Sequence, residues 1–416
     1  MAAGMVRLIT LLRSGDWLAH RRIKAYALIL LTIEIAIFGF LVAGTHGWIV
    51  PLERPTTTDF VSFYAAGALA DAGTPALAYD HAAHLAAEEA VAGQGIEYQF
   101  FNYPPVYQVL FLPIAHLPYL AAFILFEAVT LLLYLAVARR ILDDYRGAVL
   151  LALTAFPMVW WNIGLGQNAF LTAALFGAAT LFLDCRPILA GMCFGALCYK
   201  PHFALLVPVA LAVSGHWRAF TAAGLSAAVL VLGSIALLGW DTWRAFFAAA
   251  GGSHEMYESG RILFTGFVSP FGAMRLLGAG VSISYAVQAA FTAVAIAVVA
   301  IVWRRGASLP VRAAVLAAAT LVAIPLALLY DLMLATIAAC WLSRAGNEGG
   351  ALNWERTGLA ILYAALLDSR GLAEQFALPV TTLAALGLFA LVTRRAWHEL
   401  DGIRLLRRQP AATPTR

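Results

Sequence analysis

Long apolar runs recur along the whole chain, and they constrain its fold more than any other feature. Only 12% of the 416 residues are charged and 62% are hydrophobic, whereas a typical soluble domain carries about 25% charged residues. Apolar runs of about 20 residues have the length that a helix needs to cross the hydrocarbon core of a bilayer. The sequence therefore predicts an all-α, polytopic integral membrane protein, with residues 1–416 forming a single domain.

Breaks in hydropathy divide the chain into about twelve predicted membrane-spanning helices, several of them shorter than the core of a bilayer requires. The predicted spans are 25–45, 119–139, 147–164, 168–184, 187–200, 202–215, 218–239, 281–303, 311–328, 330–343, 356–368 and 375–393. A further apolar segment, 106–117, is short and ends before Pro118, and it is predicted as either a half-span or a surface helix.

The N-terminal residues 1–24 mix basic and apolar side chains ahead of the first run, and no clear cleavage site follows Gly44. This pattern predicts a cytoplasmic interfacial segment followed by an uncleaved first span, because a secretory signal peptide ends in a small-residue cleavage site.

The basic residues are distributed unequally between the two predicted faces of the membrane. Of the 27 lysines and arginines, only six lie on the predicted outer side, namely Arg54, Lys200, Arg244, Arg261, Arg275 and Arg370. Cytoplasmic loops carry the excess of basic residues in membrane proteins, so both termini, including the basic tail 394–416, are predicted to be cytoplasmic. The two long loops, 46–105 and 240–280, are then on the outer face, where we expect the active site.

The sequence also disfavours several functional classes. The net charge of +4 follows from the topology and requires no nucleic-acid partner. Neither a GxxxxGK[ST] loop nor a GxGxxG fingerprint occurs, which disfavours nucleotide-driven pumps and nucleotide-sugar enzymes. No metal site is predicted, since His254 and Glu255 lack a second histidine four residues later. The four cysteines lie in or beside apolar runs without a CxxC motif, so we interpret them as core residues.

The first outer loop contains the segment "TTTDF", in which Asp59 precedes a predicted helix over 60–72 that Gly73 and Pro75 end. Aspartate is favoured at a helix N-cap because its carboxylate accepts a hydrogen bond from an open backbone N–H. The helix dipole would keep such a carboxylate ionised, as a well-positioned but modest general base. The capping and the catalytic interpretations are compatible, and both stay open.

Other polar residues cluster at the predicted outer ends of the spans and are candidate substrate-binding residues. Most have a structural alternative: turn residues at the glycines and prolines, a lysine that extends to the membrane surface, or an acid in boundary water. The candidates are Tyr64, Asn102, Tyr103, Gln167, Asn168, Lys200, His202, His254, Arg261, Tyr330 and Asp331.

Four ordered segments of the chain resemble a known family. They are "DFVSFYAAGALADAGTPALAYD", "NYPPVYQVLFLPIAHLPYLAAF", "GQNAFLTAALFGAATLFLDCRPILAG" and "ALCYKPHFALLVPVALA". This set resembles the bacterial GT-C-type membrane glycosyltransferases of family 87, which include the polyprenyl-phosphate-mannose-dependent mannosyltransferases of actinobacteria. The resemblance covers residues 55–220 and continues more weakly to 335.

The resemblance implies a GT-C-like bundle with a large first non-cytoplasmic loop. It implies a hexosyltransferase that moves a hexose, typically mannose, with inversion from a polyprenyl-phosphate donor to a glycolipid, polysaccharide or protein acceptor. The lipid-linked sugar would be a co-substrate and no further cofactor is expected. The site would lie at the periplasmic face of a multi-pass protein in the bacterial inner membrane, in contact with the lipid bilayer.

The resemblance also implies roles for two residues. The family's aspartate in the first outer loop corresponds to Asp59 as general base, and the lysine of the "KP" segment corresponds to Lys200 near the lipid phosphate. His202 stands where many relatives carry a different polar residue. Inverting transfer needs one base and groups that stabilise the departing phosphate, without a covalent intermediate.

Two other functions remain open at this stage. One is a transporter or flippase of lipid-linked sugars, although the two halves of this chain show no self-similarity of the kind common in transporters. The other is a structural subunit of an envelope-assembly complex without chemistry of its own.

Overall fold

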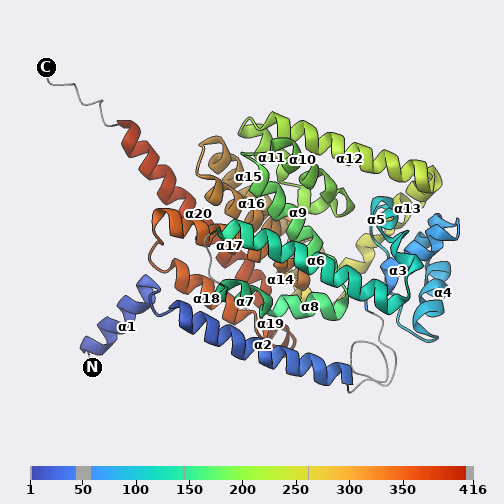
Figure 1. Cartoon of the computed structure of the whole chain (residues 1–416), viewed down its shortest axis with the longest axis horizontal. Helices are drawn as coiled ribbons and strands as arrows, with labels where there is room; N and C mark the ends of the chain where they lie inside the picture. The colour runs from blue at the N-terminus through green and yellow to red at the C-terminus, as the bar shows by residue number, and fades with distance from the viewer. Residues whose placement is uncertain (1, 44–57, 144–146, 261, 409–416) are drawn as a thin grey trace.

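Helices make up the regular structure of the described part of the chain, in agreement with the predicted all-α class. The computed structural model describes residues 2–43, 58–143, 147–260 and 262–408 (Figure 1). Within these ranges the elements are α-helices and short 3-10 helices, and one isolated antiparallel bridge pairs Phe267 with Leu328.

The first half of the chain forms α1 (Ala2–Ser14), α2 (His20–Ala43), α3 (Phe60–Asp71), η1 (Pro75–Tyr79), α4 (His81–Ala92), α5 (Pro105–Phe111), η2 (Ile114–His116), α6 (Tyr119–Leu142), α7 (Ala148–Thr154), α8 (Pro157–Leu165), α9 (Ala169–Phe182), α10 (Pro187–Ala196), η3 (Leu197–Tyr199), η4 (Pro201–Ala204) and α11 (Val207–Val213). The second half forms α12 (Trp217–Leu238), α13 (Trp240–Glu258), η5 (Phe264–Gly266), α14 (Pro270–Leu276), α15 (Val281–Arg304), α16 (Leu309–Ala323), η6 (Leu329–Leu332), α17 (Met333–Gly349), α18 (Glu355–Ala365), α19 (Ser369–Phe376) and α20 (Val380–Arg408).

The described helices include four that are long and apolar enough to cross a membrane alone, namely α2, α6, α12 and α15. Helices α7 and α8 qualify together as a fifth span, with a bend of 42° between them. The predicted count of about twelve spans is therefore not confirmed. The remaining apolar runs form shorter helices, and the 15 residues of α16 rise only about 22 Å, less than a core of about 30 Å.

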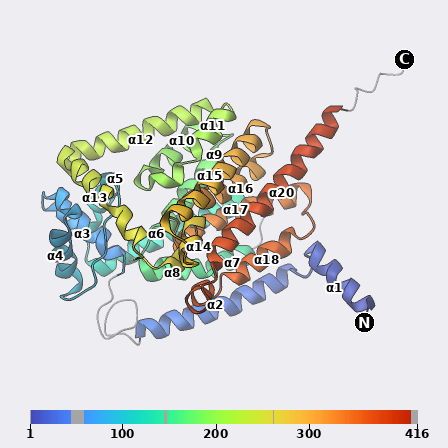
Figure 2. The same cartoon turned by 180° about the vertical axis from the view of Figure 1, so that it is seen from behind.

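Elements of the first predicted outer loop and the start of the second lie at one end of the bundle. Figures 1 and 2 show α3, α4 and α5 beside α13 at this end, with α1 and the end of α20 towards the opposite end. The first predicted outer loop and the start of the second are thus close in space. The side of the membrane that this end faces stays a prediction.

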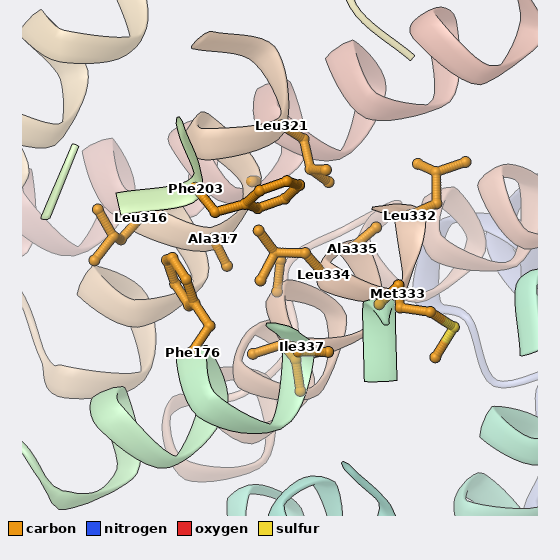
Figure 3. Close-up of a cluster of buried hydrophobic side chains, with 14 of the residues drawn as sticks. Phe176, Phe203, Leu316, Ala317, Leu321, Leu332, Met333, Leu334, Ala335 and Ile337 are labelled. Carbon is orange, nitrogen blue, oxygen red and sulfur yellow. The ribbon is translucent and has the colours of Figure 1, made fainter. Parts of the chain in front are cut away.

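The centre of the bundle is built around α16 and α17. Every residue of α16 is buried except Leu309 and Arg312. Leu316, Ala317 and Leu321 of α16 lie near Phe176 of α9 and Phe203 of η4, in one cluster with Leu334 and Ile337 of α17 (Figure 3). Small residues let helices approach closely where no hydrophobic effect drives them together, and α16 contains six alanines that serve this purpose.

The predicted helix over 60–72 is confirmed as α3. The segment 106–117 forms α5 and η2, and the side chains of Tyr107, Gln108 and Phe111 in α5 are buried. Gln108 Nε2 donates hydrogen bonds to the carbonyls of Ala66 at 2.9 Å and Pro75 at 3.0 Å. One face of α5 therefore packs on α3 and η1, whereas η2 has no buried residue. The half-span and surface-helix alternatives both stay predictions.

Candidate functional site

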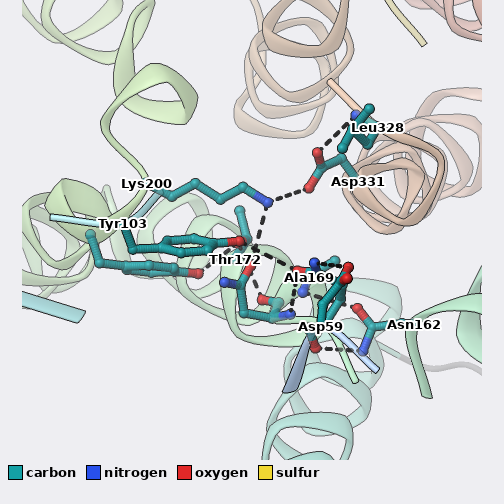
Figure 4. A network of polar contacts seen from close by, with 11 residues as sticks. Asp59, Tyr103, Asn162, Ala169, Thr172, Lys200, Leu328 and Asp331 are labelled. Carbon is teal, nitrogen blue, oxygen red and sulfur yellow. Dashed lines mark hydrogen bonds and ion pairs between the residues drawn. The ribbon is translucent and has the colours of Figure 1, made fainter. Parts of the chain in front are cut away.

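The Asp59 side chain points into the bundle at the start of α3. It makes no hydrogen bond to the backbone of its own helix. Instead, Gln167 Nε2 donates to Asp59 Oδ2 over 2.5 Å (Figure 4). The capping interpretation of this carboxylate is therefore wrong, although Asp59 does occupy the residue position before the helix.

Burial changes the acid strength of Asp59. Desolvation raises the pKa of its carboxyl to about 6, against smaller lowering effects of the Gln167 hydrogen bond and the Lys200 charge. We predicted a modest base kept ionised by the helix start, and the structure shows a different environment with the opposite shift. A carboxylate whose pKa lies closer to neutrality is the more effective proton acceptor there.

The turn between α8 and α9 brings Gln167 to Asp59. Gly166 in this turn has φ of 65°, in the left-handed region that glycine adopts without strain. A Cβ at this position would lie 2.6 Å from Phe60 Cβ and 3.1 Å from the Phe123 ring. Glycine at 166 thus allows the turn to lie directly on the first residues of α3.

Gln167 and Asn168 connect this turn to two other loops. The Tyr103 hydroxyl donates to Gln167 Oε1 at 3.4 Å, and Lys200 Nζ donates to Asn168 Oδ1 at 3.4 Å. The two amides therefore join Asp59, Tyr103 and Lys200 into one polar cluster.

Lys200 and Asp331 form a buried ion pair within this cluster. Lys200 Nζ lies 2.6 Å from Asp331 Oδ1, and the two side chains are 5% and 1% exposed. The backbone N–H of Leu328 donates to Asp331 Oδ2 at 3.0 Å. The alternatives of a surface-reaching lysine and an acid in boundary water are therefore wrong. The free energy needed to remove two charges from water offsets much of the free energy of their attraction. Stability alone therefore does not account for this pair.

Aromatic rings surround the ammonium group and the neighbouring amides. Lys200 Nζ lies 4.9 Å from the Phe203 ring centroid and 5.1 Å from that of Tyr330. The Tyr107 ring stacks on that of Tyr199, with centroids 5.1 Å apart, and is tilted against that of Tyr103, at 4.6 Å. Such rings combine an apolar face with a polar tip, which suits contact with a sugar ring.

Three of the predicted binding residues lie at the margin of the cluster or away from it. The Tyr64 hydroxyl donates to the carbonyls of Leu117 at 2.8 Å and Ala115 at 3.2 Å, so it fastens α3 to η2. Asn102 is exposed and its side chain hydrogen-bonds to Tyr257. His202 lies two residues after Lys200, and its ring is tilted against that of Phe203 with the ring centroids 4.9 Å apart.

The two candidates from the second outer loop cannot be placed relative to this cluster. The side chain of His254 and the whole of Arg261 lie outside the described residues. In the part of the chain that the structure describes, no group of three or more His, Cys, Asp or Glu side chains could hold a metal ion.

The structure adds two residues that are not among the predicted site residues, Asn162 of α8 and Glu127 of α6. Asn162 Nδ2 donates to the Gln167 carbonyl at 2.8 Å and to Glu127 Oε2 at 3.1 Å. Both lie within apolar stretches, where a polar side chain is costly unless it is hydrogen-bonded. That cost was the available signal, but the sequence does not say which partner satisfies each group.

A second buried polar pair lies between α3 and α4. His84 Nε2 lies 3.1 Å from the Ser62 carbonyl, and His84 Nδ1 lies 3.6 Å from Glu88 Oε1. Burial lowers the pKa of His84 to about 4 and raises that of Glu88 to about 8. Both groups are therefore mainly neutral at pH 7, and the pair holds α4 against the helix that Asp59 precedes.

Comparison with known proteins connects this cluster to a family. The model of glycosyltransferase family 87 matches residues 100–329, which is more than half of the chain. No curated protein and no solved structure gives a significant match to this chain. The matched range includes Tyr103, Gln167 and Lys200, whereas Asp59 precedes it and Asp331 follows it.

Proposed function

Because the chain belongs to glycosyltransferase family 87, we propose that it transfers a hexose, with mannose the first candidate, from a polyprenyl-phosphate donor to an acceptor hydroxyl. The acceptor is a glycolipid, polysaccharide or protein at the outer face of a bacterial plasma membrane. The observation that carries this proposal is one partly buried carboxylate, Asp59, held by a neutral amide close to a lysine–aspartate pair.

Asp59 is the general base in this proposal. Its carboxylate accepts the proton of the acceptor hydroxyl while the hydroxyl oxygen attacks C1 of the donor sugar. The bond from C1 to the phosphate oxygen breaks with its electron pair on that oxygen. A single displacement inverts C1 and requires only one carboxylate in this role, and the raised pKa of Asp59, about 6, supports it.

Lys200 stabilises the departing lipid phosphate. A lysine ammonium has three N–H donors, and contacts within the described residues engage two of them, with Asp331 and Asn168. The third donor is left for a phosphate oxygen. Asp331 keeps the ammonium in place, and the positive charge offsets the charge that develops on the leaving group.

The end of the bundle that carries these groups suits a lipid-linked donor. The polyprenyl chain remains among the lipids while the sugar phosphate reaches the polar cluster. A monophosphate leaving group carries less charge than a nucleotide diphosphate, so protein cations and N–H donors can stabilise its departure.

The proposal is tested in proteoliposomes that contain the purified protein, polyprenyl-phosphate-mannose and a mixture of acceptors. We expect Asp59→Asn to lower the transfer rate by about 100-fold or more, since general-base catalysis contributes roughly 10²–10⁴-fold. Asp71→Asn is the matched control, because Asp71 lies on α3 but is half-exposed and forms an ion pair with His116 at 3.4 Å. It should retain the wild-type rate.

Two outcomes would contradict the proposal. Transfer by Asp59→Asn at a near wild-type rate would remove Asp59 as the base. Protein-dependent movement of the lipid-linked sugar across the vesicle membrane without transfer would favour a flippase instead. Donors with other hexoses on the same lipid, compared in the same assay, identify the sugar.

A further inference from the structure

We propose that Asn162 is a positioning residue for Asp59, and that Glu127 fixes the side chain of Asn162. The carboxyl group of Glu127 would then influence the general base Asp59 through the amides of Asn162 and Gln167. This inference rests on the proposed function of Asp59, and it names residues that do not themselves contact a substrate.

Asn162 bridges the turn that presents Gln167. Its side chain is fully buried on α8, and Nδ2 donates to the carbonyl of Gln167 at 2.8 Å. Its Oδ1 accepts from the backbone N–H of Ala169, the first residue of α9, at 3.0 Å. One side chain therefore engages backbone groups on both sides of Asn168 and holds the turn closed.

Without this amide, the turn would lose two buried backbone hydrogen bonds. An unpaired buried backbone group costs about 1–3 kcal/mol, so the turn would move to recover partners. Gly166 lies against Phe60 with no space for a shift towards α3. Any movement would therefore carry the Gln167 side chain away from Asp59.

Glu127 holds Asn162 in place from the opposite side. Its Oε2 accepts from Asn162 Nδ2 at 3.1 Å, while its Oε1 has no hydrogen-bond partner in the described ranges. Its side-chain contact is thus a neutral amide, although a buried acid is normally paired with a cation. An acid at membrane depth without such a partner is a candidate for a functional role, and its contact with Asn162 indicates positioning.

The inference predicts a change in acidity as well as in rate. The Gln167 hydrogen bond lowers the pKa of Asp59 against the effect of burial. Moving Gln167 away removes this effect, so Asp59 would require a higher pH to become ionised. A role confined to folding would reduce the amount of stable protein without this shift.

The test compares purified Asn162→Ala with wild type in the transfer assay across pH. We expect kcat to fall roughly 10- to 100-fold, as for other supporting residues behind a functional group, with KM for the donor nearly unchanged. The acidic limb of the pH profile, in which the rate rises as Asp59 becomes ionised, should move to higher pH. Should Asn162→Ala fail to fold, Asn162→Leu removes both polar groups without adding a charge, keeps the branched shape and should shift the acidic limb in the same direction.

Gln288→Ala is the matched control. Gln288 is a buried amide on α15 that also bridges backbone groups, accepting from the Phe271 N–H at 3.1 Å and donating to the Val322 carbonyl at 3.0 Å. Its loss should lower the melting temperature without moving the acidic limb. An unmoved limb in Asn162→Ala, or an equal shift in Gln288→Ala, would overturn the inference.

Two Glu127 variants test the second part of the proposal. In Glu127→Gln the side-chain amide oxygen can still accept from Asn162, so activity should be retained, whereas Glu127→Leu should behave like Asn162→Ala. Near wild-type activity and pH profile in Glu127→Leu would remove Glu127 from the proposal.

Failure of the proposed function gives a different result from failure of this inference. If wild type transfers no sugar from any donor, the proposed function fails, and modification of Asp59 by a hydrophobic carbodiimide still reports its protonation. Mass spectrometry measures the modified fraction of Asp59 at each pH. Modification should persist to higher pH in Asn162→Ala than in wild type. Identical modification profiles would overturn the inference.

Discussion

Asp59 is partly buried beside a neutral amide, and desolvation determines its behaviour on titration. Transfer requires the ionised carboxylate, so the rate should rise with pH through about 6, the pKa that burial gives this group. The measurement is kcat/KM from pH 4.5 to 8.5 for wild type. A rate that is already constant above pH 4.5 would show that Asp59 titrates like an exposed aspartate.

The same pKa shift predicts an effect on stability. The folded-state pKa lies above the ordinary 3.8, so wild type loses stability as pH rises from 3.8 to about 6 and does not regain it above that range. Asp59→Asn removes the buried charge and should stabilise the protein at pH 7.5 by roughly 1–3 kcal/mol, but not at pH 4. Equal melting temperatures at pH 7.5 in a mild detergent would contradict this expectation.

Individual site residues were predictable to different degrees. Asp59, Gln167, Lys200 and Asp331 stood out because polar groups at the ends of apolar runs are few. Their pairing was not predictable, since Lys200 and Asp331 are 131 residues apart and no local pattern connects them. The raised pKa of Asp59 was not predictable either, because it depends on desolvation by residues that are distant in sequence.

At the scale of elements, the turn between α8 and α9 packs against the start of α3 with no space for an additional side-chain atom at Gly166. Gly166→Ala would force a positive φ on a residue with a Cβ and bring that Cβ to 2.6 Å from Phe60. We expect a loss of about 1–3 kcal/mol in the free energy of unfolding, as for other overpacked sites, together with lower activity. Thermal unfolding in detergent and the transfer assay measure the two effects.

Gly164→Ala is the control for this prediction. Gly164 lies within α8, and a Cβ there meets nothing within 4 Å, so alanine should be neutral or slightly stabilising through its helix propensity. A Gly166→Ala protein as stable and active as Gly164→Ala would show that the turn has room to relax.

Sequence patterns predicted the helices better than their role in the bundle. The helix over 60–72 was predictable because Asp59 precedes it and Gly73 and Pro75 follow it. The interior position of α16 was not, because an apolar helix has the same composition whether lipid or protein surrounds it. Helix length separates lipid-facing helices from interior helices only in part. Helix α6 is long enough to span a membrane, yet 33% of its most apolar segment is buried inside the protein.

For the whole molecule, the distribution of arginines makes a prediction about topology. A reporter enzyme that is active only outside the cytoplasm, fused after residue 80, should be active, and the same reporter fused after residue 146 should not. The first fusion follows the elements η1 and α3 at one end of the bundle, and the second follows α6. Activity of the reporter in the second fusion alone would reverse the orientation.

The buried pair of Lys200 and Asp331 has a consequence for the synthesis of the chain. A ribosome adds about 5–20 residues per second, so the 131 residues that separate the two take on the order of ten seconds to make. During this interval the nascent chain contains Lys200 without its counter-charge. The segment around Lys200 must therefore wait at the membrane surface, or against an insertion factor, until residue 331 emerges and the two can enter the interior as a neutral unit.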